Sequence, residues 1–135
     1  MCCYTKYGIF MSETKKIKRL DFVGASREVL SGFPEEVKED IGYALFLAQR
    51  GEMPGNAKPL KGFCGAGVLE VLEDFRGGAY RAVYTVKFAD VIYVLHCFQK
   101  KSRQGIKTPL AEMELVRNRL KVAEEDYRMY YSGGR

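Results

Sequence analysis

The stretch VLEVLEDFRGGAYRAVYTVKFADVIYVLHCF, residues 68–98, decides how this chain folds. It contains three runs rich in β-branched and aromatic residues, which are typical of strands: Val68–Glu73, Ala79–Lys87 and Val91–Phe98. The Gly77-Gly78 pair between the first two runs is typical of a hairpin turn, and only residues 88–90 separate the second run from the third. Strands joined by such short links are antiparallel neighbours, so the stretch predicts an antiparallel meander.

The part of the chain before this stretch adds one strand and two helices. Residues Ile17–Val23 alternate well enough for a strand. Ser26 is a candidate N-cap of a short helix that ends near Leu30, and Pro34 marks the start of a longer helix. The apolar residues of the longer helix recur every three or four positions and predict one buried stripe: Val37, Ile41, Ala44, Leu45 and Ala48.

A last helix follows Thr108-Pro109, which fit an N-cap and a first helical position. Its predicted apolar face comprises Met113, Val116, Leu120 and Ala123. The predicted order is β-α-α-β-β-β-α, an α+β fold in which two N-terminal helices and one C-terminal helix pack on an antiparallel sheet. If the helices cover one face of that sheet, the other face is expected to be open.

Length and composition favour one soluble globular domain. The 135 residues are 47% hydrophobic and 29% charged, and we expect residues 17–131 to form a single domain. Residues 1–16 are expected to be a peripheral extension, with Met11 as an alternative start, and residues 132–135 a disordered tail. The four cysteines and the single histidine lack metal-ligand spacing, so no metal or cofactor is expected. Without a membrane-spanning run or a signal peptide, we expect a cytoplasmic protein.

Positive charge is concentrated in one segment. The formal net charge is +5, yet residues 75–107 hold seven cations and one acid, Asp90, which gives +6 for this segment alone. The seven cations are Arg76, Arg81, Lys87, Lys100, Lys101, Arg103 and Lys107. Such a basic patch suits the phosphate backbone of a nucleic acid, although a solvated surface explains the charge equally well.

Strand alternation assigns Arg81 to the open face of the sheet. Tyr80, Ala82 and Tyr84 share one face of the middle strand, and Arg81 lies on the other. An open face with arginine and lysine around it suits single-stranded RNA, and a guanidinium stabilises the charge of a phosphate transition state. The alternative for Arg81 is a structural ion pair across the strands with Glu70.

His96 also has two interpretations. It lies within an apolar run, where a lone histidine is more often a core residue whose ring nitrogens have partners. The functional interpretation is a general acid or base. Cys97 has no second histidine to activate it, which argues against a thiol protease.

Four segments together resemble one known family. Lys58–Phe63, Tyr80–Tyr84, Ile92–Lys101 and Thr108-Pro109 look like the phage-derived branch of the RelE/HigB toxin superfamily, with similarity over roughly residues 17–126. The resemblance implies a RelE-like fold and a toxin of a toxin–antitoxin system. It further implies a metal-independent, ribosome-associated mRNA endonuclease that inhibits translation. The implied partners are a helix-turn-helix antitoxin, mRNA and the ribosome.

The resemblance also assigns site residues. The strand arginine of the family falls on Arg81, and its basic cluster after the last strand falls on Lys100, Lys101 and Arg103. We therefore predict a catalytic set of Arg81, Lys100, Lys101 and His96, and an RNA-binding set of Lys61, Lys87, Arg103 and Lys107. The chain departs from the family at Glu70 and Glu73, where some relatives carry lysines, and no tyrosine is evident beside Thr108-Pro109. The general base and acid therefore stay unassigned.

Two other functions stay open at this stage. A ParE-like toxin would share the fold and inhibit DNA gyrase by binding, without cutting RNA. A plain RNA-binding module would use the same basic patch without catalysis. Codon preference and oligomeric state are not predicted.

Overall fold

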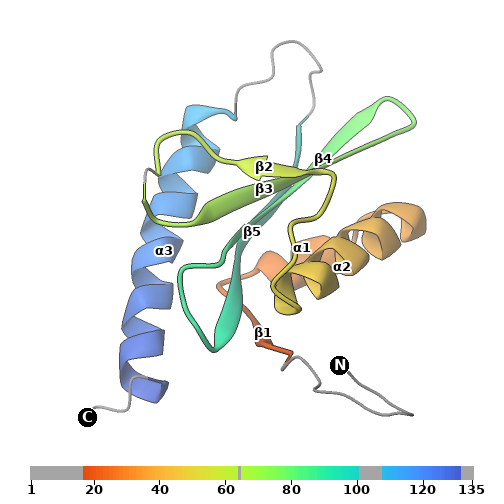
Figure 1. Ribbon diagram of the computed structural model, residues 1–135. Coiled ribbons are helices and arrows are strands. Elements are labelled where there is room, and N and C mark those ends of the chain that lie inside the picture. The colour runs from red at the N-terminus through yellow and green to blue at the C-terminus, as the bar shows by residue number, and fades with distance from the viewer. Residues whose placement is uncertain (1–16, 64, 101–107, 132–135) are drawn as a thin grey trace, which may run out of the picture.

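The computed structural model describes residues 17–63, 65–100 and 108–131 (Figure 1). In chain order the elements are β1 (Arg19–Phe22), α1 (Ser26–Ser31), α2 (Glu35–Gln49), β2 (Ala57–Pro59), β3 (Val68–Phe75), β4 (Gly78–Thr85), β5 (Val91–Lys100) and α3 (Leu110–Tyr130). The predicted α+β class is confirmed, with two N-terminal helices and one C-terminal helix. The predicted extension and tail lie outside the described residues. None of the helices described is long and apolar enough to cross a membrane.

The strands form one sheet in the order β1-β5-β4-β3-β2. The predicted meander is confirmed, because β3 pairs with β4 and β4 with β5, both antiparallel. Two details differ from the prediction. The short strand β2 lies where a loop was expected and adds an edge next to β3. In addition, β1 pairs with β5 in parallel, because the chain leaves β1 through α1 and α2 and returns only at the far side of the sheet.

The β3–β4 hairpin turns at Arg76 and Gly77, one residue earlier than the glycine pair indicated. Both residues have positive φ, 50° and 82°, as a two-residue type I′ turn requires. Phe75 pairs with Gly78 on either side of the turn. The turn fixes the register that brings the residues of the candidate site onto one face.

Helices cover both faces of the sheet (Figure 1). The α2 stripe packs on the face of Ala82, Tyr84 and Ile92, and all five of its predicted residues are buried. The residues Val116, Leu120 and Ala123 of α3 pack on the opposite face, against Val83, Tyr93 and Leu95 among others. The expectation of an open face is therefore wrong, because α3 lies on the face that carries Arg81.

Two predicted helix caps serve other contacts. The N-cap of α1 is Ala25, and the buried Ser26 hydroxyl instead donates to the Val94 carbonyl at 3.1 Å. The N-cap of α3 is Pro109, one residue later than predicted, and the Thr108 hydroxyl donates to Glu70 at 3.0 Å. Both hydroxyls tie a helix end to the sheet rather than to the helix backbone.

Glu73 on β3 carries a perturbed carboxyl group. Burial and the neighbouring Asp40 carboxylate on α2 raise the pKa of Glu73 to about 7, against a hydrogen bond from Asn56 that acts in the opposite direction. The folded protein therefore binds this proton more tightly than the unfolded chain, whose glutamate has an ordinary value of 4.5. The contribution of Glu73 to stability is present at low pH and is lost as the pH rises through about 7.

We expect Glu73→Gln to stabilise the protein at pH 8 and to have no effect near pH 4.5. The amide cannot ionise, so at high pH the variant avoids both a partly buried charge and its repulsion by Asp40. The expected gain in the free energy of unfolding is on the order of 1 kcal/mol, because solvent screens a partly exposed pair. Urea denaturation at the two pH values measures it, with the exposed Glu39→Gln as the control. An equal effect at both pH values would contradict this account.

Candidate functional site

Four charged or titratable residues on three adjacent strands share one face of the sheet. Glu70 lies on β3, Arg81 on β4, and His96 and Lys100 on β5. The register places Val83 between Glu70 and His96, while Ala79, two residues from Arg81, pairs with Lys100. All four are buried, with Glu70 only 2% exposed. Charged side chains are rarely this buried unless they are paired, so their partners define what the site does.

Arg81 is held at two edges of its guanidinium. Its Nη1 donates to Asp74 at 3.2 Å and to the Tyr80 carbonyl at 2.9 Å, and its Nε lies 4.0 Å from Glu70 Oε2. The ion pair with Glu70 that formed the structural interpretation is therefore present. Within the described part of the chain, Nη2 donates to no residue. The guanidinium thus combines a fixed position with one remaining donor, a form suited to an anion such as phosphate.

The Glu70 carboxylate has one engaged oxygen. Thr108 and Arg81 both contact Oε2, and no residue among those described contacts Oε1. Glu70 therefore has an oxygen available to accept a proton or a hydrogen bond from a ligand.

His96 has a partner at each ring nitrogen. Its Nε2 lies 2.5 Å from Glu112 Oε1, and its Nδ1 lies 3.3 Å from Arg119 Nη1, both on α3. Arg119 also donates to the Leu95 carbonyl at 3.0 Å. Glu112 favours a proton on Nε2, and Arg119, which can only donate, favours a lone pair on Nδ1. These contacts are the partners expected of a core histidine, and they fix the ring on the face of the sheet that carries Arg81 and Glu70.

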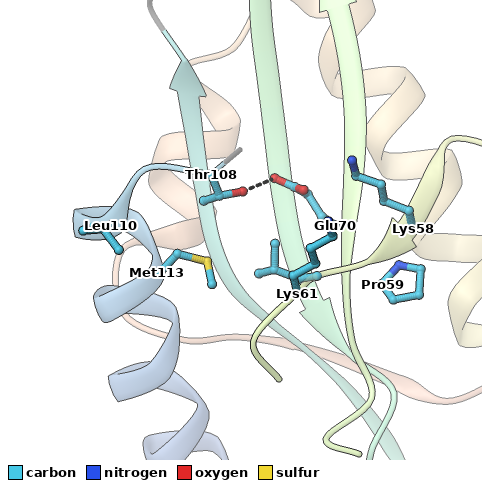
Figure 2. Close-up of a pocket in the computed structure, with 8 residues that line it drawn as sticks. Lys58, Pro59, Lys61, Glu70, Thr108, Leu110 and Met113 are labelled. Carbon is cyan, nitrogen blue, oxygen red and sulfur yellow. Dashed lines mark hydrogen bonds between the residues drawn. The ribbon is translucent and has the colours of Figure 1, made fainter. Parts of the chain in front are cut away.

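A pocket of about 260 Å³ opens beside this group (Figure 2). Its lining residues come from the β2 segment, β3 and the start of α3: Lys58, Pro59, Leu60, Lys61, Glu70, Thr108, Leu110 and Met113. Figure 2 shows the Glu70 carboxylate between the Thr108 hydroxyl and the Lys58 side chain. Of the predicted RNA-binding residues, Lys61 lies at this pocket and is exposed.

Of the other predicted residues that the structure describes, Lys87 does not join the group. Lys87 follows the opposite end of β4 and pairs with Glu124 of α3 at 2.5 Å. Lys101, Arg103 and Lys107 lie outside the described residues. Burial raises the pKa of the Cys97 thiol to about 12, which keeps it protonated at neutral pH and unsuited to nucleophilic attack.

Sequence analysis missed several residues of the group. Glu70 was named as an ion-pair partner and as a departure from the family pattern, and Thr108 as a cap within a family-like segment, but neither was predicted as a site residue, and Glu112 and Arg119 were not named at all. The signal for the last two is their spacing, because Glu112, Val116 and Arg119 recur at four and three positions and so share the sheet-facing side of α3. Within the described chain, no cluster of three or more His, Cys, Asp or Glu side chains could hold a metal ion.

Comparison with known proteins gives the class of this chain. Residues 28–121 match the family described as phage-derived protein Gp49-like. The chain belongs to this family, which confirms the phage-derived branch of the RelE/HigB superfamily indicated by its sequence motifs.

Among solved structures, the toxin–antitoxin complex RelBE2 from Mycobacterium tuberculosis is similar over 67% of this chain and 100% of that chain. The TM-score is 0.44 and the sequence identity 18%. No curated protein matches the chain.

Proposed function

We propose that this protein is the toxin of a toxin–antitoxin pair, and that it inhibits translation by cutting mRNA on the ribosome without a metal ion. Membership of the phage-derived Gp49-like family supports this role. The observation that carries the proposal is the shared sheet face of Glu70, Arg81, His96 and Lys100. A cognate helix-turn-helix antitoxin is the proposed partner.

The proposed reaction is an attack by the RNA 2′-hydroxyl on the adjacent phosphate. The 2′-oxygen forms a bond to phosphorus as the bond from phosphorus to the 5′-oxygen breaks, which leaves a 2′,3′-cyclic phosphate and a 5′-hydroxyl. Three tasks must be met: removal of the 2′-hydroxyl proton, stabilisation of the extra charge on phosphate, and protonation of the departing 5′-oxygen.

The four residues have the chemistry for these tasks. The free Oε1 of Glu70 is suited to accept the 2′-hydroxyl proton. Arg81 offers Nη2 to a phosphate oxygen, and Lys100 supplies a second cation near it on the same face. His96 is the proposed donor to the departing 5′-oxygen, a role that requires one ring nitrogen to exchange its partner on α3 for that oxygen. Lys61 and the basic residues 101, 103 and 107 would contact flanking phosphates, and Lys87 a more distant one.

The test is cleavage of mRNA by the purified protein with translating ribosomes. We expect cuts in the mRNA whose upstream products end in a 2′,3′-cyclic phosphate, together with growth arrest on expression. Growth arrest with gyrase inhibition and intact mRNA would instead support the ParE-like alternative. RNA binding without either effect would support a plain RNA-binding module.

A further inference from the structure

The pocket beside Glu70 has an apolar wall on each side. Pro59 and Leu60 line it from the β2 segment, and Leu110 and Met113 line it from the first turn of α3 (Figure 2). Leu110 is 83% exposed, so its side chain is accessible to a ligand that enters the pocket. The volume of the pocket, about 260 Å³, falls just below the ~300–1,000 Å³ typical of pockets for drug-sized ligands. A single flat ring system therefore fits better than an extended segment.

The mouth of the pocket is positively charged. Lys58 and Lys61 both line it and are both exposed, and neither forms an ion pair with any residue in the described part of the chain. Two unpaired ammonium groups beside an apolar hollow are complementary to a ligand with a flat apolar body and an anionic chain. A nucleotide within single-stranded RNA has this combination, with a base that stacks on apolar side chains and phosphates on either side.

We propose that this pocket holds the nucleobase of the nucleotide immediately before the cut, and that Lys58 and Lys61 bind the phosphates on its 5′ side. The inference rests on the proposed function, because it concerns the substrate of the same site. Glu70 makes the connection: it lines the pocket and has a free oxygen for the 2′-hydroxyl proton. A base seated in the pocket brings its own ribose to Glu70, and its 3′ phosphate to Arg81.

This arrangement makes the pocket a determinant of sequence preference. A pocket that borders the attacking nucleotide selects the base that precedes the cut, whereas Arg81 contacts only phosphate, which is common to all sequences. Leu110 and Met113 decide how much ring surface fits. Mutations in the pocket should therefore change which base precedes the cut, whereas mutations at Arg81 should change the rate of cleavage.

The first test measures binding without cleavage. The probes are the four nucleoside 3′-monophosphates and, as the base-free reference, inorganic phosphate, titrated while the methyl resonances of Leu110 and Met113 are followed by NMR. We expect at least one nucleotide to bind about tenfold or more tightly than phosphate and to shift both methyl signals. Equal affinity for nucleotides and phosphate would overturn the proposal. The pocket would then be better explained as a binding site for an apolar side chain of a protein partner.

Two surface variants test the assignment without endangering the fold. Leu110→Asp places a carboxylate at the mouth, and Lys58→Ala/Lys61→Ala removes both cations. Each is expected to weaken nucleotide binding by about fivefold or more, and the lysine pair should also reduce its salt dependence. The matched controls are Met129→Asp and Lys121→Ala, which change exposed residues on the same helix away from the pocket. Equal losses in variants and controls would contradict the assignment.

The second test uses cleavage and separates the two proposals. In the parent enzyme we expect a preferred base before the cut, and Leu110→Asp should alter that preference, while Arg81→Lys should slow every cut alike. Nucleotide binding in the pocket of a protein that cuts no RNA would refute the nuclease and leave the base pocket standing. Cleavage with no base preference, unchanged in Leu110→Asp, would refute the base pocket and leave the nuclease standing.

Discussion

Arg81→Ala is expected to cleave mRNA at least about 10²-fold more slowly than the parent protein, the scale for loss of one preorganised electrostatic stabiliser. The guanidinium is fixed by Asp74 and the Tyr80 carbonyl, so Nη2, which has no partner among the residues described, needs no reorientation when charge develops on the phosphate. Growth arrest on expression should disappear in parallel. The measurement is the single-turnover rate of cleavage on ribosome-bound mRNA.

Arg81→Ala also removes the ion-pair partner of the buried Glu70, which could destabilise the fold. A second variant therefore separates loss of catalysis from loss of stability. Arg81→Lys retains the charge beside Glu70 and loses the planar guanidinium, and it should fold like the parent yet cleave at least tenfold more slowly. Arg76→Ala is the matched control, because Arg76 lies on the same hairpin and in the same basic segment but is exposed. Circular dichroism confirms the fold of each variant. Folded Arg81 variants that cleave like the parent would remove Arg81 from the site.

The meander and the helix faces follow from local features of the sequence. Short links leave two consecutive strands no geometry but antiparallel pairing, and the α2 stripe follows from helical periodicity alone. The pairing of β1 with β5 does not follow, because these segments are separated by some seventy residues and only tertiary packing brings them together.

The sequence did contain evidence that both faces of the sheet are covered. β5 begins with five consecutive apolar residues, Val91 to Leu95, and all are at most 2% exposed. A strand with one solvated face alternates, whereas an uninterrupted apolar run indicates burial on both faces. The placement of Arg81 relative to α3 thus depends on a neighbouring strand rather than on its own.

The face of His96 could not be predicted. From Val91 onward, strict alternation groups His96 with Ile92 and Val94, which pack toward α2. The register shifts within β5, where Val83 pairs with His96 and Tyr84 with Val94, so Leu95 has no partner on β4. This bulge turns His96 to the face of Arg81 and α3. No glycine or proline marks the bulge in the sequence, so the convergence of the site depends on a feature visible only in the fold.

His96→Gln is expected to fold and to cleave about 10²–10⁴-fold more slowly, the range for loss of a general acid. Glutamine can still exchange hydrogen bonds with Glu112 and Arg119, so the packing of α3 on the sheet should survive. An amide cannot deliver a proton at neutral pH. The single-turnover rate of cleavage measures the loss, and an unchanged rate in the folded variant would remove His96 from the proposed reaction.

Glu112→Gln separates proton transfer from support of the fold. The Glu112 carboxylate lies 2.5 Å from Nε2 and fixes the imidazole ring, so Glu112→Gln should slow cleavage at least about tenfold while the melting temperature stays close to that of the parent. A purely structural pair would instead lower the melting temperature of both variants and leave the single-turnover cleavage rate of the folded protein unchanged. Since Glu112 of α3 and Thr108, just before α3, contact the sheet residues His96 and Glu70, a slower rate in folded Glu112→Gln would make the start of α3 part of the catalytic apparatus as well as of the core.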